Sequence, residues 1–144
     1  MDALQIVFTE NKCVNIRIDL TKDIPLTILG KYPSLQKKDR RLCLHEIIYA
    51  EDFPPLADVF NEIVSGRQKA LNAHCRVKVG GDYHWIYLCC NLRKDTFNKS
   101  LHLSGTMMDV SEYFDASQDD MVLEEVKKKS SQRMNTAEDA SIAD

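Results

Sequence analysis

Residues Ala73–Glu112 read AHCRVKVGGDYHWIYLCCNLRKDTFNKSLHLSGTMMDVSE and carry the pattern of consecutive antiparallel strands. In Ala73–Val79 hydrophobic and polar residues alternate, which is the two-residue period of a half-buried strand. The segment Gly80–Asp82 follows at once and suits a tight turn. Tyr83–Leu92 is therefore predicted to fold back as the hairpin partner of the first strand.

The register of this hairpin depends on which residues form its turn. With Gly81–Asp82 as the two turn residues, Lys78 faces Trp85 and Arg76 faces Tyr87 across the strands. Such pairs of a cation and an aromatic ring suit a partly exposed sheet face. A slip of one residue would bury the charged side chains, so the hydrophobic pattern limits the register.

Further strands are predicted on both sides of this region. Leu101–Val110 is the third strand of the series, and Gly105 in its middle indicates a bend or a close approach of backbones. Near the start of the chain, Leu4–Phe8 and Val14–Leu20 alternate in the same way and are predicted to form a hairpin. The sequence thus predicts five strands.

Helices are predicted between the two groups of strands. Ile24–Gly30 suggests one helical turn, and Leu42–Ile48 a second short helix. A longer helix is predicted after Asp52 as N-cap, with apolar residues at helical spacing up to Val64 and Gly66 as its stop. The sum is an α+β protein, with an antiparallel sheet and its helices gathered on one face.

Composition limits the class of protein. The 144 residues are 44% hydrophobic and 28% charged, which fits one domain with an ordinary core and a polar tail. The net charge of -3 and the pI near 5.8 argue against a nucleic-acid surface. The sequence shows neither a membrane-spanning run nor the layout of a signal peptide, and its five cysteines fit a reducing compartment, so a cytoplasmic location is expected.

Three segments in this order resemble a PAS domain, in the variant that ends in a PAC-type motif. They are YAEDFPPLADVFNEIVSG (49–66), GGDYHWIYL (80–88) and SGTMMDVSE (104–112). The family's DG-x-x-x-W turn appears with its first two residues reversed, as Gly81-Asp82 before Trp85. Its closing G-x-x-x-D-[IV]-[ST]-E pattern appears in full from Gly105 to Glu112. The resemblance covers about residues 4–112.

This resemblance implies a sensory and signal-relay module of a cytosolic bacterial signalling protein, with a five-stranded sheet that holds a small cavity against its helices. A ligand or a partner would be sensed there, with no metal, no cofactor and no catalysis by the module itself. Asp109 and Ser111 lie where the relay would leave the sheet, although capping a helix could be all that they do. The residues expected to line the cavity are Ile47, Phe60, Cys75, Val77, Ile86 and Leu88.

The resemblance also implies partners. Trp85 and Tyr87 are expected on the outer sheet face, where they would pair with a second copy in a homodimer, or be covered by residues 113–134 of the same chain. The domain is expected to span residues 1–112, and 113–144 to be a helical or disordered linker to an output domain. The last residues, 140–144, resemble those just before diguanylate cyclase (GGDEF) domains, and a histidine kinase is the other candidate output.

Two alternatives involve histidine or cysteine chemistry. A haem-binding PAS gas sensor would need an axial histidine, for which His45 and His84 are the candidates. A small enzyme could use Cys75 with His45 as a nucleophilic pair. Flavin photochemistry is rejected, because the stretch around Cys75 lacks the residues that the photoactive branch of the family requires. Cys89 and Cys90 are adjacent on a strand and point to opposite faces, so they cannot grip one metal together.

Overall fold

The computed structural model describes residues 2–97 and 99–113. The chain divides into two compact units, Met1–Asp109 and Val110–Asp144, and the first unit holds the sheet. The elements are α1 (Ala3–Glu10), β1 (Cys13–Asp19), β2 (Pro25–Ile28), η1 (Lys37–Arg40), β3 (Arg41–Cys43), α2 (Leu44–Ile47), η2 (Ala50–Asp52), α3 (Phe53–Val64), β4 (Ala70–Val79), β5 (Asp82–Lys94), β6 (Leu101–Asp109) and η3 (Ser111–Tyr113).

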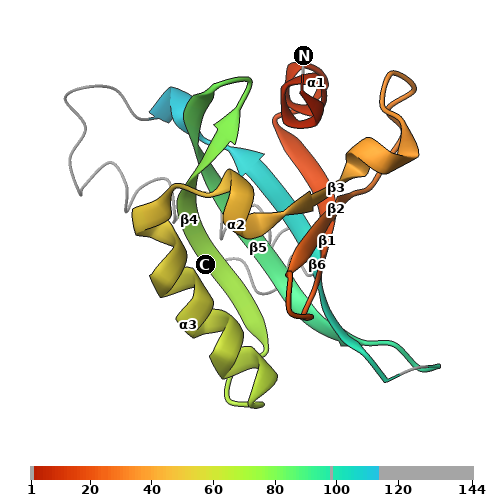
Figure 1. Ribbon diagram of the computed structural model, residues 1–144, viewed down its shortest axis with the longest axis vertical. Coiled ribbons are helices and arrows are strands. Elements are labelled where there is room, and N and C mark those ends of the chain that lie inside the picture. The colour runs from red at the N-terminus through yellow and green to blue at the C-terminus, as the bar shows by residue number, and fades with distance from the viewer. Residues whose placement is uncertain (1, 98, 114–144) are drawn as a thin grey trace, which may run out of the picture. The chain divides into compact units, whose positions relative to one another are not determined.

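The strands of the first unit form one curled antiparallel sheet. Within the described residues it has six strands in the order β3-β2-β1-β6-β5-β4. The last strand, β6, lies between β1 and β5, and its Gly105 faces Ile16 on one side and Cys90 on the other. Figure 1 shows the strong curl of the sheet, with α3 alongside β4 and α1 near the start of β1. The position of β6 places its last residues beside both β1 and β5.

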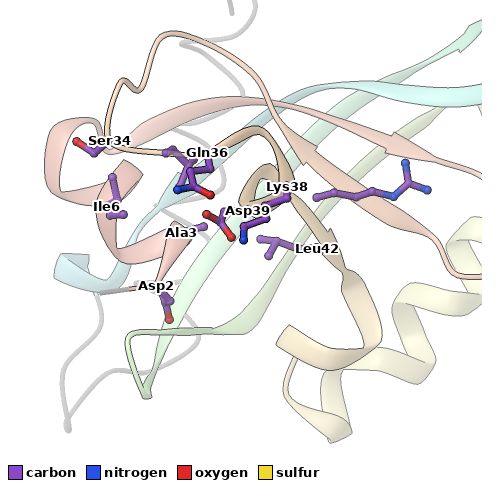
Figure 2. A pocket seen from close by; sticks show the side chains of 10 residues that line it. Asp2, Ala3, Ile6, Ser34, Gln36, Lys38, Asp39 and Leu42 are labelled. Atoms are coloured by element: carbon purple, nitrogen blue, oxygen red, sulfur yellow. The ribbon is translucent and has the colours of Figure 1, made fainter.

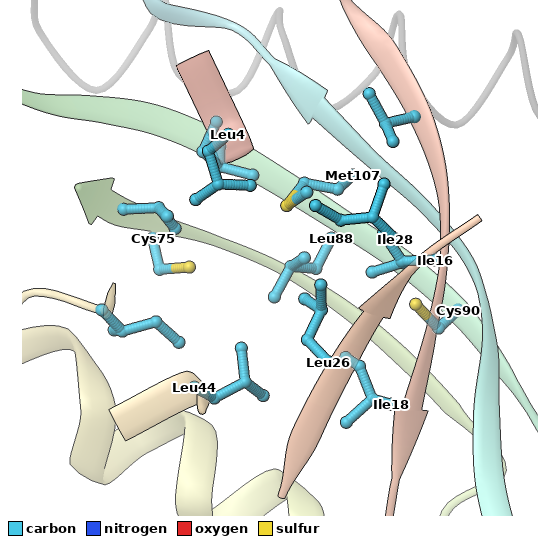
Figure 3. Close-up of a cluster of buried hydrophobic side chains, with 14 of the residues drawn as sticks. Leu4, Ile16, Ile18, Leu26, Ile28, Leu44, Cys75, Leu88, Cys90 and Met107 are labelled. Carbon is cyan, nitrogen blue, oxygen red and sulfur yellow. The ribbon is translucent and has the colours of Figure 1, made fainter. Parts of the chain in front are cut away.

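The core lies on the inner face of this sheet. Inward residues of the strands alternate with outward ones, as the two-residue period requires. Side chains from α1, α2 and α3 join them in one buried cluster, shown in part in Figure 3. The helical members of the cluster are Leu4, Val7, Phe8, Leu44, Leu56, Phe60 and Ile63. Burial of this apolar surface is the main term that stabilises the fold.

Two elements of the first half differ from the prediction. The predicted strand Leu4–Phe8 is the helix α1, because Leu4, Val7 and Phe8 share one helical face and the Asp2 side chain caps the helix by accepting from the Gln5 N–H. The predicted helical turn at Ile24–Gly30 contains the strand β2 instead. With the short edge strand β3, the sheet has six strands where five were predicted.

The remaining elements follow the prediction closely. The helices α2 and α3 lie inside the predicted segments, and β4, β5 and β6 match their predicted strands to within three residues at each end. Gly66 follows α3 with a φ of 86°, as expected of a stop signal that needs a left-handed conformation. The predicted antiparallel sheet with helices is therefore confirmed at this level, while its strand number was wrong.

The register of the β4–β5 hairpin differs by two residues from the predicted one. The turn residues are Gly80 and Gly81, with φ of 61° and 97°, so Val79 pairs with Asp82. Arg76 consequently faces Trp85 rather than Tyr87. A shift of two residues leaves every side chain on its predicted face, which is why the hydrophobic pattern could not exclude it.

Candidate functional site

The residues predicted to line a cavity are part of the packed core. Five of them lie in the buried cluster and are at most 4% exposed, and Ile47 is partly buried against it. Cys75 and Leu88 are seen there in Figure 3. The five are Phe60, Cys75, Val77, Ile86 and Leu88. The structure brings the predicted residues together, as side chains that fill the inner side of the sheet.

A buried carboxyl group lies at the end of the last strand, in contact with a histidine. Asp109 is the final residue of β6 and is 4% exposed, although it carries a carboxyl group. Its Oδ2 lies 2.9 Å from Nδ1 of His84, which is close to the start of β5. The backbone N–H of Asp109 also donates to the carbonyl oxygen of Lys12, ahead of β1. Asp109 therefore joins the starts of β1 and β5 to the end of β6.

Ser111, the other predicted relay residue, opens the short helix η3 in the second unit. Within this unit the Tyr113 N–H donates to the carbonyl oxygen of Val110. The predicted linker beyond Tyr113, including the segment that resembles the approach to a GGDEF domain, lies outside the described residues. Only one residue, Val110, separates Asp109 from Ser111 along the chain.

A second charged contact closes the free edge of the sheet. Asp52, just ahead of α3, receives two hydrogen bonds from the Arg76 guanidinium, at 2.8 and 2.9 Å, and one from the Arg76 backbone N–H at 2.8 Å. The Arg76 carbonyl oxygen at this edge is bonded as well, since it accepts from the Tyr49 N–H. Asp52 is the N-cap residue of α3, as predicted, but its carboxylate binds Arg76 and makes no hydrogen bond that caps the helix.

Burial and charge act in opposite directions on this carboxyl group. Burial raises the pKa of Asp52, but the hydrogen bonds and the positive charge of Arg76 outweigh it, so the pKa of Asp52 lies below its ordinary value of 3.8. The guanidinium also lies over two aromatic rings, 4.0 Å from the centre of Tyr49 and 5.2 Å from that of Trp85. Tyr83 meets the Tyr49 ring edge-on at 5.1 Å.

On the outer face of the sheet, the predicted contact residues differ in exposure. Trp85 is half-buried, whereas Tyr87 is 6% and the neighbouring Cys89 8% exposed. The Cys89 thiol donates to the side-chain oxygen of Asn72 at 3.2 Å. Trp85 is therefore the more exposed of the two predicted contact residues.

The residues considered for a haem site and for a cysteine–histidine enzyme lie in different environments. Cys75 is 1% exposed, and burial, helped by the negative charge of Asp52, raises the pKa of its thiol to about 12. A nucleophilic cysteine needs a lowered pKa, so this environment disfavours the thiolate. His45 is exposed on α2, and the Nδ1 of His84 is engaged with Asp109. Within residues 2–97 and 99–113, no three histidine, cysteine or acidic side chains cluster in a way that could hold a metal.

The sequence missed both ion pairs. Asp52 and Arg76 are 24 positions apart and His84 and Asp109 are 25 apart, so no local pattern joins the partners. One signal was present in the sequence: the strand that contains Arg76 has no acidic residue of its own that could pair with it.

Among the described residues, the structure contains no helix that is long and apolar enough to cross a bilayer.

Comparison with known proteins finds similarity only in structure. No family model matches the chain, and no curated protein matches it. A sensory box histidine kinase/response regulator from Burkholderia thailandensis E264 is similar with a TM-score of 0.54 and 14% identity, over 90% of this chain and 97% of that one. A domain described as that of a light and redox sensing histidine kinase from Haloarcula marismortui gives a TM-score of 0.48 and 16% identity, over 72% and 94%. The first of these likenesses supports a PAS-like fold for this chain.

Proposed function

We propose that this chain is a PAS-type sensory and signal-relay module that catalyses no reaction itself. The observation that carries the proposal is the buried Asp109 at the exit of the central strand, paired with His84. A buried carboxyl group is tolerated where its hydrogen-bond partner is in place, and its burial becomes costly when that partner moves. The PAS-like fold and the dense inner core agree with a module whose output is a change of packing.

The relay we propose is a change at this ion pair. Any ligand or partner can shift the domain only if it binds two arrangements of the sheet with different affinity. A small slide of β5 against β6 would alter the His84–Asp109 contact, because the two residues lie on different strands. The change would pass along the chain from Asp109 into Val110 and η3, and from there into an output domain of the diguanylate cyclase or histidine kinase type.

Asp109→Asn tests the relay, since it keeps the shape of the side chain and removes its charge. We expect hydrogen exchange at the Tyr113 amide to rise about tenfold, the effect of losing roughly 1.4 kcal/mol, while amides of β1 and β2 keep their protection. NMR-detected exchange on the whole chain measures both. The exposed His45→Gln serves as a control. Unchanged exchange at Tyr113, or an equal rise throughout the sheet, would contradict a relay role.

We further propose that the module forms a weak homodimer through the outer sheet face. Trp85 is the half-buried aromatic of this face, and a charge placed there should oppose association. Native mass spectrometry of the wild-type chain is expected to show a dimer at tens of micromolar concentration, and Trp85→Glu a monomer. The same spectra would reveal a bound small molecule as added mass. A wild type that stays monomeric at these concentrations rules out the dimer, and Glu46→Gln on the exposed part of α2 is the control.

A further inference from the structure

A half-open pocket lies between α1 and the segment that contains η1, at the margin of the core. Its volume is about 460 Å³, within the range of small-molecule sites. Its apolar lining comes from Ala3 and Ile6 of α1 and from Leu35 and Leu42 opposite them, as Figure 2 shows in part. Lys38, Asp39 and Arg41 add charges of both signs. We infer that this pocket binds a small zwitterion, an α-amino acid with an apolar side chain.

The wall opposite α1 is held in place by one arginine. The Arg40 guanidinium donates to the backbone carbonyl oxygens of Ile28, Gly30 and Tyr32. It also lies 5.8 Å from the centre of the Tyr32 ring. The Leu35 N–H donates to the Tyr32 carbonyl oxygen, which orders the next turn of the chain. The wall is therefore held by contacts within the chain, and preorganisation of this kind reduces the entropic cost of binding.

The α1 wall is fixed at both of its ends. At the start, the Asp2 carboxylate accepts from the backbone N–H groups of Gln5 and Gly80, at 2.8 and 2.7 Å. At the end, the side-chain amide of Asn11 donates to the Tyr32 hydroxyl at 3.3 Å, which ties α1 to the opposite wall. Both walls thus keep their spacing without an occupant.

Three charged side chains of the pocket, those of Lys38, Asp39 and Arg41, form no ion pair within the described residues. The ion pairs of the described residues are Arg17–Asp19, Arg67–Glu62, Arg76–Asp52 and His84–Asp109, and they include no charged residue of this pocket. The Asp2 carboxylate, by contrast, is already engaged by two backbone donors. Asp39 is therefore the acceptor available to an ammonium group, and Lys38 and Arg41 are the cations available to a carboxylate.

This arrangement selects among small ligands by their charge. A simple anion would be attracted by Lys38 and Arg41 but repelled by Asp39. A simple cation would be attracted by Asp39 but repelled by Lys38 and Arg41. An α-amino acid satisfies both signs and places its apolar side chain against Ile6 and Leu42. Because the charged groups are exposed, the affinity expected is modest, with a Kd on the order of 10 μM to 1 mM.

Isothermal titration of the full chain with L-leucine tests this inference. We expect L-leucine to bind at least about tenfold more tightly than isocaproate, which lacks the ammonium group, or isoamylamine, which lacks the carboxylate. Asp39→Asn and Lys38→Gln should each weaken L-leucine binding by about tenfold or more. Lys37→Gln, the neighbouring lysine that does not line the pocket, should leave it unchanged.

Two outcomes would overturn the inference. One is no heat of binding for L-leucine up to about 10 mM, since the affinity would then lie below the range that such contacts support. The other is L-leucine binding that Asp39→Asn leaves intact. Tighter binding of isocaproate than of L-leucine would reject the zwitterion as well. All three substitutions lie at exposed positions, so loss of the fold is not expected, and thermal unfolding of each variant checks this. The site does not depend on the proposed relay, because ligand binding is measured whether or not Asp109 transmits it.

Discussion

Gly105→Ala is expected to cost at least about 4 kcal/mol of folding free energy, a large share of the ~5–15 kcal/mol that stabilises a typical domain. A Cβ at this position would lie 2.0 Å from the Cys89 carbonyl oxygen and 2.6 Å from the Cys90 Cα. Both are backbone atoms of the paired strand β5, which cannot turn aside as a flexible side chain can. Since β1 pairs with β6 on the other side, β6 has no room to move away. Circular dichroism with urea denaturation measures the loss.

The matched control is the same substitution where space is free. Gly66, after α3, has no atom within 4 Å of a built Cβ, and only its φ of 86° is unfavourable to alanine. Gly66→Ala should therefore cost roughly 1 kcal/mol. If Gly105→Ala were no more destabilising than Gly66→Ala, the tight approach of β5 and β6 would be refuted. The expected result would explain physically why a glycine stands in the middle of β6.

Asp52→Ala is expected to destabilise the domain by roughly 2–4 kcal/mol, or to lower its Tm by about 8–15 °C. The substitution removes three hydrogen bonds at once and leaves the partly buried Arg76 guanidinium and one backbone N–H of β4 without their acceptor. Asp58→Ala, an exposed aspartate on α3, is the control and should cost less than about 0.5 kcal/mol. Arg76→Lys by itself should lose part of the same stabilisation, because lysine keeps the charge but cannot form the two-pronged contact. Equal losses for Asp52→Ala and Asp58→Ala would show that the edge contact contributes nothing.

The same ion pair sets an acid limit to stability. The pKa of Asp52 is lower in the folded chain than its ordinary value of 3.8, so the folded state holds the proton less tightly than the unfolded state. Its contribution is complete above pH 3.8 and is lost as the pH falls through the folded pKa. Free energies of unfolding measured between pH 6 and pH 2 should accordingly converge for wild type and Asp52→Ala at the acid end. A constant gap across this range would exclude the carboxylate as the source.

The sequence by itself determined the second half of the first unit. The alternation along β4, β5 and β6 and the helical spacing along α3 are local properties, and each period specifies which side chains face the core. Gly105 could be recognised for the same reason, since a glycine inside a strand has few causes other than a close approach. The three segments that resemble a PAS domain all lie in or beside these elements.

Only the tertiary structure decided the first half and the site contacts. Leu4–Phe8 satisfies both a strand period and a helical one, and its docking against the core selects the helix. A shift of the β4–β5 register by two residues would expose no apolar side chain, so the register is set by the position of the turn. Asp52 meets Arg76, His84 meets Asp109, and α1 faces the segment around Lys38 only after the sheet has closed. Periodicity reports the face on which a residue lies, whereas partners distant in sequence are chosen by the packing of the whole chain.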